Sequence, residues 1–221
     1  MRLINTVARI IDDKCTGCKI CAQVCPTLAI TMEPIPGSKN RKLAIVADEQ
    51  CTGCTACEQR CPFDAIYMEN MEESRVIGVN PAQVEQERLQ QICYDAHLHP
   101  EQVVCYCTGT RAEEVAAAIL LGADTPDKIS MATGLRTGCT VECLQPAMRL
   151  LHAAGHHPEP QKGMYQWYGA TPTIWDIPDE IKEKYVQRGF YFDDDIEFME
   201  RIRNYQSNAE ASANGSKGEV K

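Results

Sequence analysis

Apolar residues recur at helical spacing near the middle of the chain. One stripe, at positions i, i+3, i+4 and i+7, consists of Leu89, Ile92, Cys93 and Ala96. Upstream, Asn80 precedes Pro81, a pair typical of an N-cap and a first-turn proline. The pattern predicts a linker helix that buries this stripe, and it favours a small buried thiol at Cys93 over a ligand or a redox group.

Three more helices are predicted before residue 155. The first begins at a Thr110–Glu113 capping box and ends at Gly122. The second begins at Thr125 and Pro126 and ends near Gly134, and the third begins near Pro146 and ends at Gly155. His97 and His99 precede this region in a polar stretch that ends at Pro100, and we interpret them as residues of a solvated loop.

Two stretches repeat each other at an offset of 36 residues. Residues 12–33 and 48–69 agree at 13 of 22 positions, including four cysteines and the proline that follows the fourth. Between them, PGSKN at residues 36–40 predicts a turn that joins two short strands. Two copies are too few for a solenoid, so we interpret the repeat as a duplicated cofactor unit.

The pattern changes again after Gly155. His156, His157 and two prolines predict a linker, in which the histidines are solvated rather than metal ligands. Prolines interrupt residues 164–178 and predict an extended segment, which holds Tyr165, Trp167, Tyr168 and Trp175. This segment cannot form its own core, so it lies across another part of the chain or anchors in another subunit. An acidic helical run then leads to Arg203, and residues 207–221 contain few apolar side chains.

Composition narrows the class of protein. The 221 residues include 22 Lys and Arg against 31 Asp and Glu, and the net charge of -9 argues against a nucleic-acid surface. There are 13 cysteines, but no apolar signal core precedes Cys15, and the apolar run Val115–Leu121 is too short to span a bilayer. We therefore expect a cytoplasmic protein with reduced thiols, in which clustered cysteines are metal ligands rather than disulfides.

Each repeat contains a C-x2-C-x2-C-x3-C-P run. Three thiolates so close in sequence can wrap three corners of a cubane cluster, and Gly17 and Gly53 permit a close approach of the backbone. We expect Pro26 and Pro62, after the fourth cysteines, to direct the chain into helices. A structural zinc site would instead show two cysteine pairs with a longer spacer.

By these residues, positions 1–75 resemble the bacterial two-[4Fe-4S] ferredoxin domain. In that family the fourth cysteine of each run binds the other cluster. The resemblance therefore implies one cluster on Cys15, Cys18, Cys21 and Cys61, and a second on Cys51, Cys54, Cys57 and Cys25. The longer insert between the runs departs from the family pattern, and a longer hairpin explains it better than a partner contact does.

A different cysteine pattern occupies residues 103–155. Cys105 and Cys107 form a C-x-C pair, and 31 residues later Cys139 and Cys143 form a C-x3-C pair. Two pairs of thiolates suit a [2Fe-2S] cluster with two ligands for each iron, and the N-terminus of the third helix would stabilise them. The segment resembles the bacterioferritin-associated-ferredoxin type of [2Fe-2S] domain, although the second pair is one residue wider than the common C-x2-C. A zinc site remains the alternative.

The predicted architecture is α+β. A two-[4Fe-4S] ferredoxin domain (1–75) is followed by a linker helix (76–102), a small all-α [2Fe-2S] domain (103–155) and a partner-contacting tail (156–221). The chain has no G-x-G-x-x-G and no G-x4-G-K-[ST] motif, so we expect it to pass electrons and not to catalyse a reaction alone. It is interpreted as a subunit of a larger oxidoreductase whose partner carries a flavin or a catalytic metal. A free ferredoxin-like carrier and an iron or cluster delivery protein are the alternatives.

Overall fold

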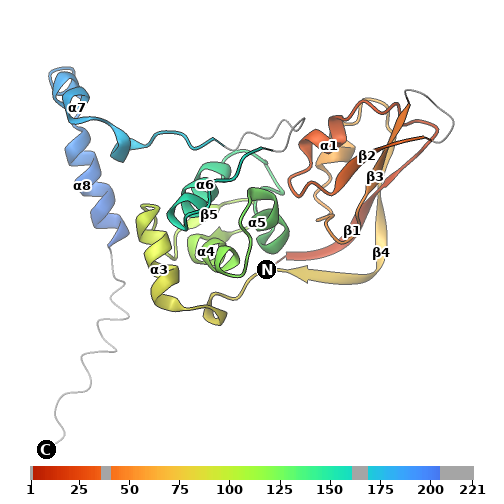
Figure 1. Ribbon diagram of the computed structural model, residues 1–221, viewed down its shortest axis with the longest axis horizontal. Coiled ribbons are helices and arrows are strands. Elements are labelled where there is room, and N and C mark those ends of the chain that lie inside the picture. The colour runs from red at the N-terminus through yellow and green to blue at the C-terminus, as the bar shows by residue number, and fades with distance from the viewer. Residues whose placement is uncertain (1, 36–40, 161–168, 205–221) are drawn as a thin grey trace, which may run out of the picture. The chain divides into compact units, whose positions relative to one another are not determined.

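The computed structural model describes residues 2–35, 41–160 and 169–204. They belong to two compact units, of which the first holds the residues up to Ala96 together with Pro100–Ala170. The second unit holds His97–His99 and the residues from Thr171 onward. Both helices and small two-stranded sheets are present (Figure 1), which confirms an α+β fold.

Two antiparallel ribbons form the first part of the chain. Strand β1 (Arg2–Ile10) pairs with β4 (Ile66–Ile77), and β2 (Ile30–Pro34) pairs with β3 (Lys42–Val46). The β2–β3 pair confirms the two predicted short strands, while their predicted turn at residues 36–40 lies outside the described residues. Strand β4 is the longest at 12 residues and continues past the repeat to pair with Arg2–Ile4.

The two repeats fold in the same way. Helices α1 (Ile20–Val24) and α2 (Ala56–Arg60) come directly before the fourth cysteines, not after the prolines as we expected. Past each proline the chain makes a turn with positive φ, at Leu28 in one repeat and Asp64 in the other. A turn prevails there because the chain must return at once to pair as β2 or β4.

The linker region confirms the buried stripe but not the start of the helix. Asn80 caps a short 3-10 helix η1 (Pro81–Gln83). Helix α3 (Gln86–Asp95) begins five residues after Pro81, the proline that was predicted to open it. The Gln86 side chain donates to the carbonyls of Pro81 and Val84 and so closes the intervening turn. Cys93 on α3 is fully buried, as predicted.

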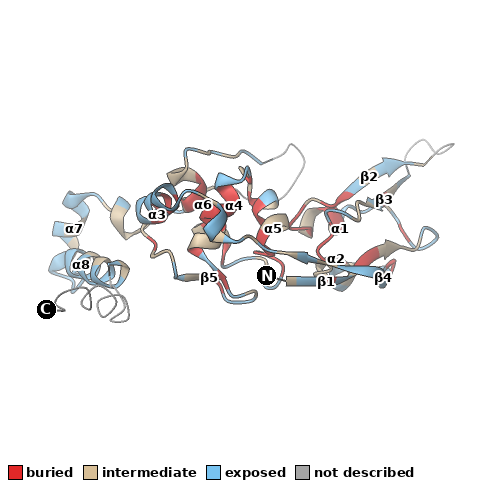
Figure 2. Ribbon diagram, turned by 90° about the horizontal axis from the view of Figure 1, so that it is seen from below, coloured by how far each residue is buried: buried red, intermediate tan, exposed pale blue. Residues whose placement is uncertain are grey.

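Three helices and a small ribbon form the region that follows. Helices α4 (Ala112–Leu120), α5 (Pro126–Thr133) and α6 (Leu144–Ala153) supply most of its buried residues (Figure 2). Thr125 and Gly134 cap α5 as predicted, and the Thr125 hydroxyl accepts from the Lys128 amide.

Two expectations for this region were wrong. Strands β5 (Val103–Cys105) and β6 (Thr110–Arg111) form a short ribbon, so the region is not all-α. Because Thr110 is used in this ribbon, the capping box starts one residue later than predicted, with Glu114 accepting from the Arg111 amide. Gln102 accepts from the Ala112 amide and so fixes the ribbon against the start of α4.

The second unit has little interior. It contains a 3-10 helix η2 (Ile174–Asp176) and helices α7 (Asp179–Val186) and α8 (Phe192–Arg203), and none of these elements has a buried residue (Figure 2). Trp175 stacks on His97 with ring centroids 4.2 Å apart, so His97 is half-buried and not in a solvated loop. Tyr165, Trp167 and Tyr168 lie outside the described residues. Within the part of the chain that the structure describes, no helix is long and apolar enough to span a membrane.

Candidate iron–sulfur sites

Four predicted ligands enclose one cavity in the ferredoxin-like part, here named site 1. The cavity is lined by Cys15, Cys18, Cys21 and Cys61. Its remaining walls are largely apolar and include Ile10, Met32 and Phe63. The first three cysteines come from one run and the fourth from the other, which is the set that the resemblance implied; that they bind one cluster stays a prediction.

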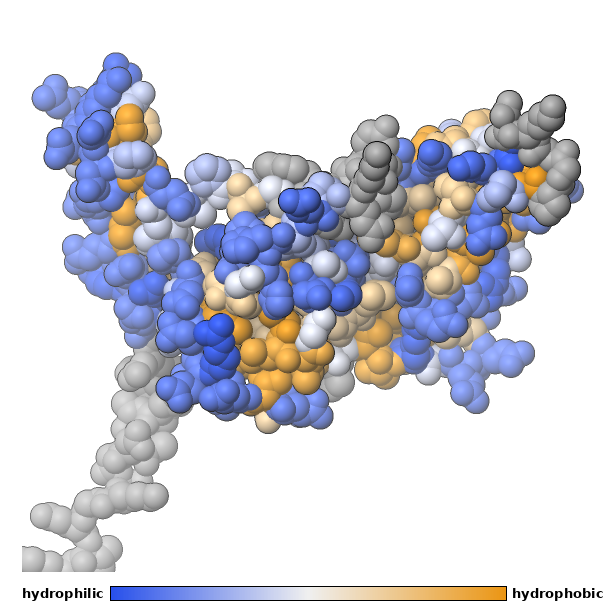
Figure 3. All heavy atoms as spheres, viewed as in Figure 1, coloured by the Kyte–Doolittle hydropathy of each residue, from blue (hydrophilic) through white to orange (hydrophobic). Residues whose placement is uncertain are grey.

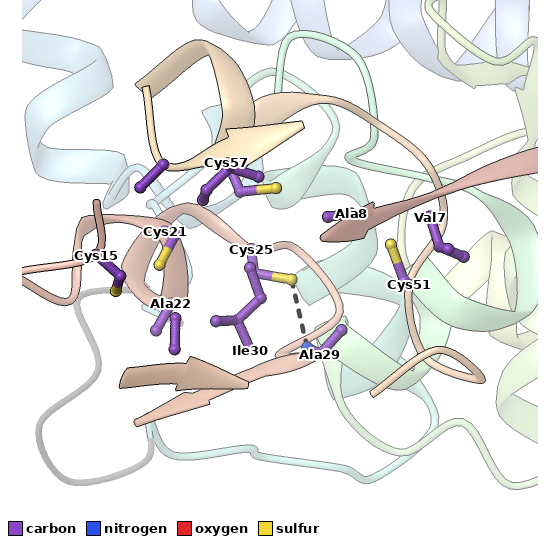
Figure 4. Close-up of a cluster of buried hydrophobic side chains, with 13 residues drawn as sticks. Val7, Ala8, Cys15, Cys21, Ala22, Cys25, Ala29, Ile30, Cys51 and Cys57 are labelled. Carbon is purple, nitrogen blue, oxygen red and sulfur yellow. Dashed lines mark hydrogen bonds between the residues drawn. The ribbon is translucent and has the colours of Figure 1, made fainter. Parts of the chain in front are cut away.

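A second cavity, named site 2, has the complementary set of cysteines. It is lined by Cys25, Cys51, Cys54 and Cys57. Figure 4 shows Cys25 pointing into the interior between the two repeats, near Cys57 and apart from Cys15 of its own run. Three threonines also line this site, Thr27, Thr52 and Thr55.

Backbone amides point at the sulfur atoms of the fourth cysteines. The Ala29 amide lies 3.3 Å from the Cys25 Sγ (dashed in Figure 4), and the Ala65 amide lies 3.4 Å from the Cys61 Sγ. The turn after each proline creates this geometry. An N–H group that donates to sulfur stabilises a thiolate ligand and the negative charge of a bound cluster.

Burial opposes ionisation of these thiols when they are considered alone. Burial raises the pKa of Cys21 to about 11, and the neighbouring Cys15 and Cys18 add to the shift. Burial likewise raises the pKa of Cys57 to about 12, with contributions from Cys54 and Cys25. Such thiols give up their protons only to a strongly bound cation, so metal binding and proton release are coupled here.

Two arginines hold the first cysteine of each run in the same way. Arg41 donates to the Cys15 carbonyl at 3.2 Å and to the Asp12 carbonyl at 3.1 Å. Arg75 donates to the carbonyls of Cys51 and Glu49. These arginines are not equivalent in the repeat, so the sequence alignment of the two copies did not reveal them.

The glycines of the cysteine runs are required by the close packing of the backbone. Gly17 has φ +73°, and a Cβ placed on it would lie 2.4 Å from the Lys42 carbonyl oxygen. Gly53 has φ +61°, and its Cβ would lie 2.6 Å from the Thr6 carbonyl oxygen. The predicted close approach is therefore present, but it is to the neighbouring strands β3 and β1.

A third cavity, named site 3, brings together the four cysteines of the second motif. Cys105, Cys107, Cys139 and Cys143 line it, together with Gln102, Val103, Val104, Tyr106, Glu142 and Pro146. The Cys139 amide lies 3.4 Å from the Cys107 Sγ. The sequence analysis did not identify Gly138 as a residue of this site. A Cβ there would lie 2.4 Å from the Cys107 Cβ and would push the Cys139–Cys143 pair away from the Cys105–Cys107 pair.

Backbone amides also shape the electrostatics of site 3. The amides of Val141 and Glu142, in the turn before α6, lower the pKa of Cys139. The Cys143 thiol lowers the pKa of Cys105 to about 5, which leaves Cys105 ready to act as a thiolate. These amides lie in the turn before α6 and not in its first turn, where the prediction placed them.

The other candidate residues lie apart from the three sites. Burial raises the pKa of Cys93 to about 12, as expected for an inert thiol. His157 packs against the His152 ring, with centroids 4.6 Å apart. Within the described ranges, no group of three or more His, Cys, Asp or Glu is placed to hold a single metal ion.

Comparison with family models assigns both cysteine regions. Residues 14–65 match the 4Fe-4S dicluster domain, and residues 103–153 match the BFD-like [2Fe-2S] binding domain. A comparison with curated proteins finds no match. Both matched segments coincide with the sites built from cysteines, and they give the chain a capacity for electron transfer. The chain thus carries a 4Fe-4S dicluster domain followed by a BFD-like [2Fe-2S] binding domain.

Proposed function

We propose that this chain is the iron–sulfur electron-transfer subunit of a larger oxidoreductase. It would hold two [4Fe-4S] clusters, at sites 1 and 2, and one [2Fe-2S] cluster at site 3. The observation that carries the proposal is that three separate cavities are each lined by four cysteines. When bound, such clusters accept and release single electrons.

The residues around each cavity suit such clusters. Sulfur is the ligand that iron–sulfur clusters require, and amides of Ala29, Ala65 and Cys139 are aimed at three of the sulfurs. In site 2, the buried Thr52 hydroxyl makes no well-formed hydrogen bond within the described residues, although it lowers the pKa of the neighbouring Cys54 thiol. A buried hydroxyl is normally satisfied, and sulfur atoms inside the cavity would supply the acceptor.

Site 3 is the site best placed for exchange with another protein. Cys107 and Cys139 are exposed, unlike Cys105 and Cys143. Two apolar side chains next to these cysteines face solvent, with Tyr106 83% and Val141 69% exposed. An apolar rim around an accessible cofactor is suited to a docked redox partner.

The second unit supports an assembly rather than a free carrier. Figure 3 shows hydrophobic atoms along α7 and α8, and their large exposed side chains include Ile181, Val186, Phe198 and Ile202. Two amphipathic helices without a buried residue obtain little stability from their own packing. We infer that they anchor the chain to a partner subunit that carries a flavin or a catalytic metal.

The experiment is anaerobic purification of the native protein with its partners. The proposal predicts about ten iron atoms per chain and EPR signals of both cluster types. About two iron atoms, or a colourless folded protein, would contradict it. A monomer that reduces soluble acceptors would favour the free carrier, and transfer of iron to an apo-acceptor would favour the delivery protein.

A further inference from the structure

Sites 1 and 2 come from equivalent repeat positions but have different walls. At an offset of 36 residues, Thr16 corresponds to Thr52 and Phe63 corresponds to Thr27. Thr16 is exposed, whereas Thr52 is only 3% exposed. Phe63 is 44% exposed, whereas Thr27 is only 2% exposed. Site 2 therefore has two buried hydroxyls where site 1 has an exposed hydroxyl and an aromatic ring.

Thr27 is in place to donate to a ligand of site 2. Its Oγ1 lies 3.6 Å from the Cys25 Sγ, the sulfur that also faces the Ala29 amide. A ligating thiolate has no proton, so in the loaded site the hydroxyl of Thr27 must be the donor. In site 1 the corresponding sulfur belongs to Cys61, and Phe63 has no hydroxyl to offer it.

Thr52 supplies an independent observation. It lies between Cys51 and Cys54 and lines site 2. Its buried Oγ1 makes no well-formed hydrogen bond within the described residues, and the neighbouring Cys54 thiol, whose pKa this hydroxyl lowers, is a group that can accept one. Because an unsatisfied buried hydroxyl is costly, the geometry indicates an acceptor inside the cavity, which the sulfur atoms of a cluster provide.

The two hydroxyls have a physical task at a buried site. Reduction adds negative charge to a cluster, and exclusion of water makes that charge less favourable. Site 1 is open to water at Cys18 and Thr16, both of which are exposed. Site 2 has no exposed cysteine, because Cys25, Cys51 and Cys57 are buried and Cys54 is half-buried, and water therefore has less access to its sulfurs.

We propose that Thr27 and Thr52 are built-in hydrogen-bond donors that raise the reduction potential of the cluster at site 2, in place of the water that reaches site 1. They act on the cluster's electronic properties and are positioning residues rather than ligands. The inference rests on the proposed binding of [4Fe-4S] clusters at both sites.

The test is a potentiometric titration of the full-length, cluster-loaded protein, followed by EPR. Thr27→Val and Thr52→Val remove a hydroxyl at nearly constant volume. Each variant is expected to lower the reduction potential of one [4Fe-4S] cluster, and the affected cluster is the same in both variants. The expected change is about fivefold in the reduction equilibrium, or about 40 mV for a one-electron couple. The matched control Thr16→Val changes the exposed equivalent and leaves both potentials unchanged.

Several outcomes would overturn the inference. They are unchanged potentials in both valine variants at full iron content, shifts of two different clusters, and an equal shift in Thr16→Val. If a valine variant fails to load site 2, Thr27→Ser and Thr52→Ser take its place, because serine retains the hydroxyl. Both serine variants must keep the original reduction potential. A lower reduction potential in both serine variants would also contradict the inference. Absence of [4Fe-4S] signals from the unmodified protein would instead count against the proposed function.

Discussion

Cys61 belongs to the second repeat in sequence but lines site 1 together with three cysteines of the first repeat. We expect Cys61→Ser to empty or distort site 1, with a loss of up to about four iron atoms per chain. The crossed arrangement can be tested with pairs of substitutions. A Cys15→Ser/Cys61→Ser variant should hold as much iron as either single variant, whereas Cys51→Ser/Cys61→Ser should lose both [4Fe-4S] clusters.

Iron and sulfide analysis with EPR measures these differences. The matched control is Cys93→Ala, because Cys93 is fully buried but lies outside all three sites. It should keep the full iron content and lower the free energy of unfolding by roughly 1 kcal/mol through lost packing. Additive iron loss in Cys15→Ser/Cys61→Ser would contradict the crossed assignment.

Gly53 tests the role of backbone packing at a single residue. Alanine there must adopt φ +61° and place its Cβ against the Thr6 carbonyl, so either the strand or the Cys51–Cys54 loop must move. We expect Gly53→Ala to destabilise the protein by more than about 2 kcal/mol and to reduce occupancy of site 2. Gly109→Ala is the control, since Gly109 has φ +66° but no atom within 4 Å of an added Cβ. The visible absorbance of Gly53→Ala should bleach at a lower denaturant concentration than that of Gly109→Ala. Bleaching at the same concentration in both variants would show that the clash at Gly53 is relieved without cost.

At this scale the grouping of the cysteines that line the three sites could be predicted, because the spacing of thiolates is dictated by cluster chemistry. The burial of Thr27, the position of Arg75 and the need for Gly138 could not, because each depends on a chain segment distant in sequence. Arg75, for example, reaches the Cys51 carbonyl only because β4 continues beyond the repeat.

At the scale of elements, short-range rules succeeded where one cap decided the outcome. Thr125 and Gly134 fix both ends of α5, as their sequence positions indicate. Predictions failed where a competing tertiary contact used the same residue. Thr110 joins β6 instead of capping α4, and the prolines after the fourth cysteines lead into turns because β2 and β4 must pair at once.

One ion pair ties strand β1 to the loop that leads into Cys51. Arg9 donates to both carboxylate oxygens of Asp48, at 2.6 and 2.9 Å. The guanidinium lowers the pKa of Asp48, so this carboxylate stabilises the folded state above its unfolded pKa and loses the effect only as the pH falls through the lower folded value. Because both side chains are partly exposed, we expect Asp48→Asn to cost less than about 1 kcal/mol.

The pH dependence of this effect provides the measurement. The ratio of bleaching rates between Asp48→Asn and the unmodified protein in guanidinium should be the same at pH 8 and pH 5, since Asp48 is ionised at both. Asp194→Asn is a control at an exposed carboxylate outside the Arg9 contact. A ratio that approaches one at pH 5 would mean that the pKa of Asp48 is raised in the folded protein, opposite to the direction that the Arg9 contact gives it.

At the scale of the whole molecule, the order of the two cluster regions could be predicted because each is encoded by local cysteine motifs. The division into units could not, because it groups His97–His99 with the residues from Thr171 onward, which lie far away in the sequence. Composition indicated an unsatisfied aromatic segment, but not that His97 would be stacked on Trp175.

Removal of the second unit separates cluster binding from assembly. A chain that ends at Ala170 keeps all twelve cysteines of sites 1 to 3. We expect it to retain about ten iron atoms and both EPR signals but to lose the co-purifying subunits. Native mass measurement of the two forms tests this. Retention of the partners by the shortened chain would place the anchor elsewhere.

The length of β4 has a consequence for all three sites. Arg75 on β4 holds the Cys51 loop of site 2, and two residues further Ile77 contacts Gly134, which lies shortly before Cys139 of site 3. The same strand begins at Ile66, which lines site 1. One strand therefore touches the surroundings of all three sites, so a substitution that bends or shortens β4 would disturb them together rather than one at a time.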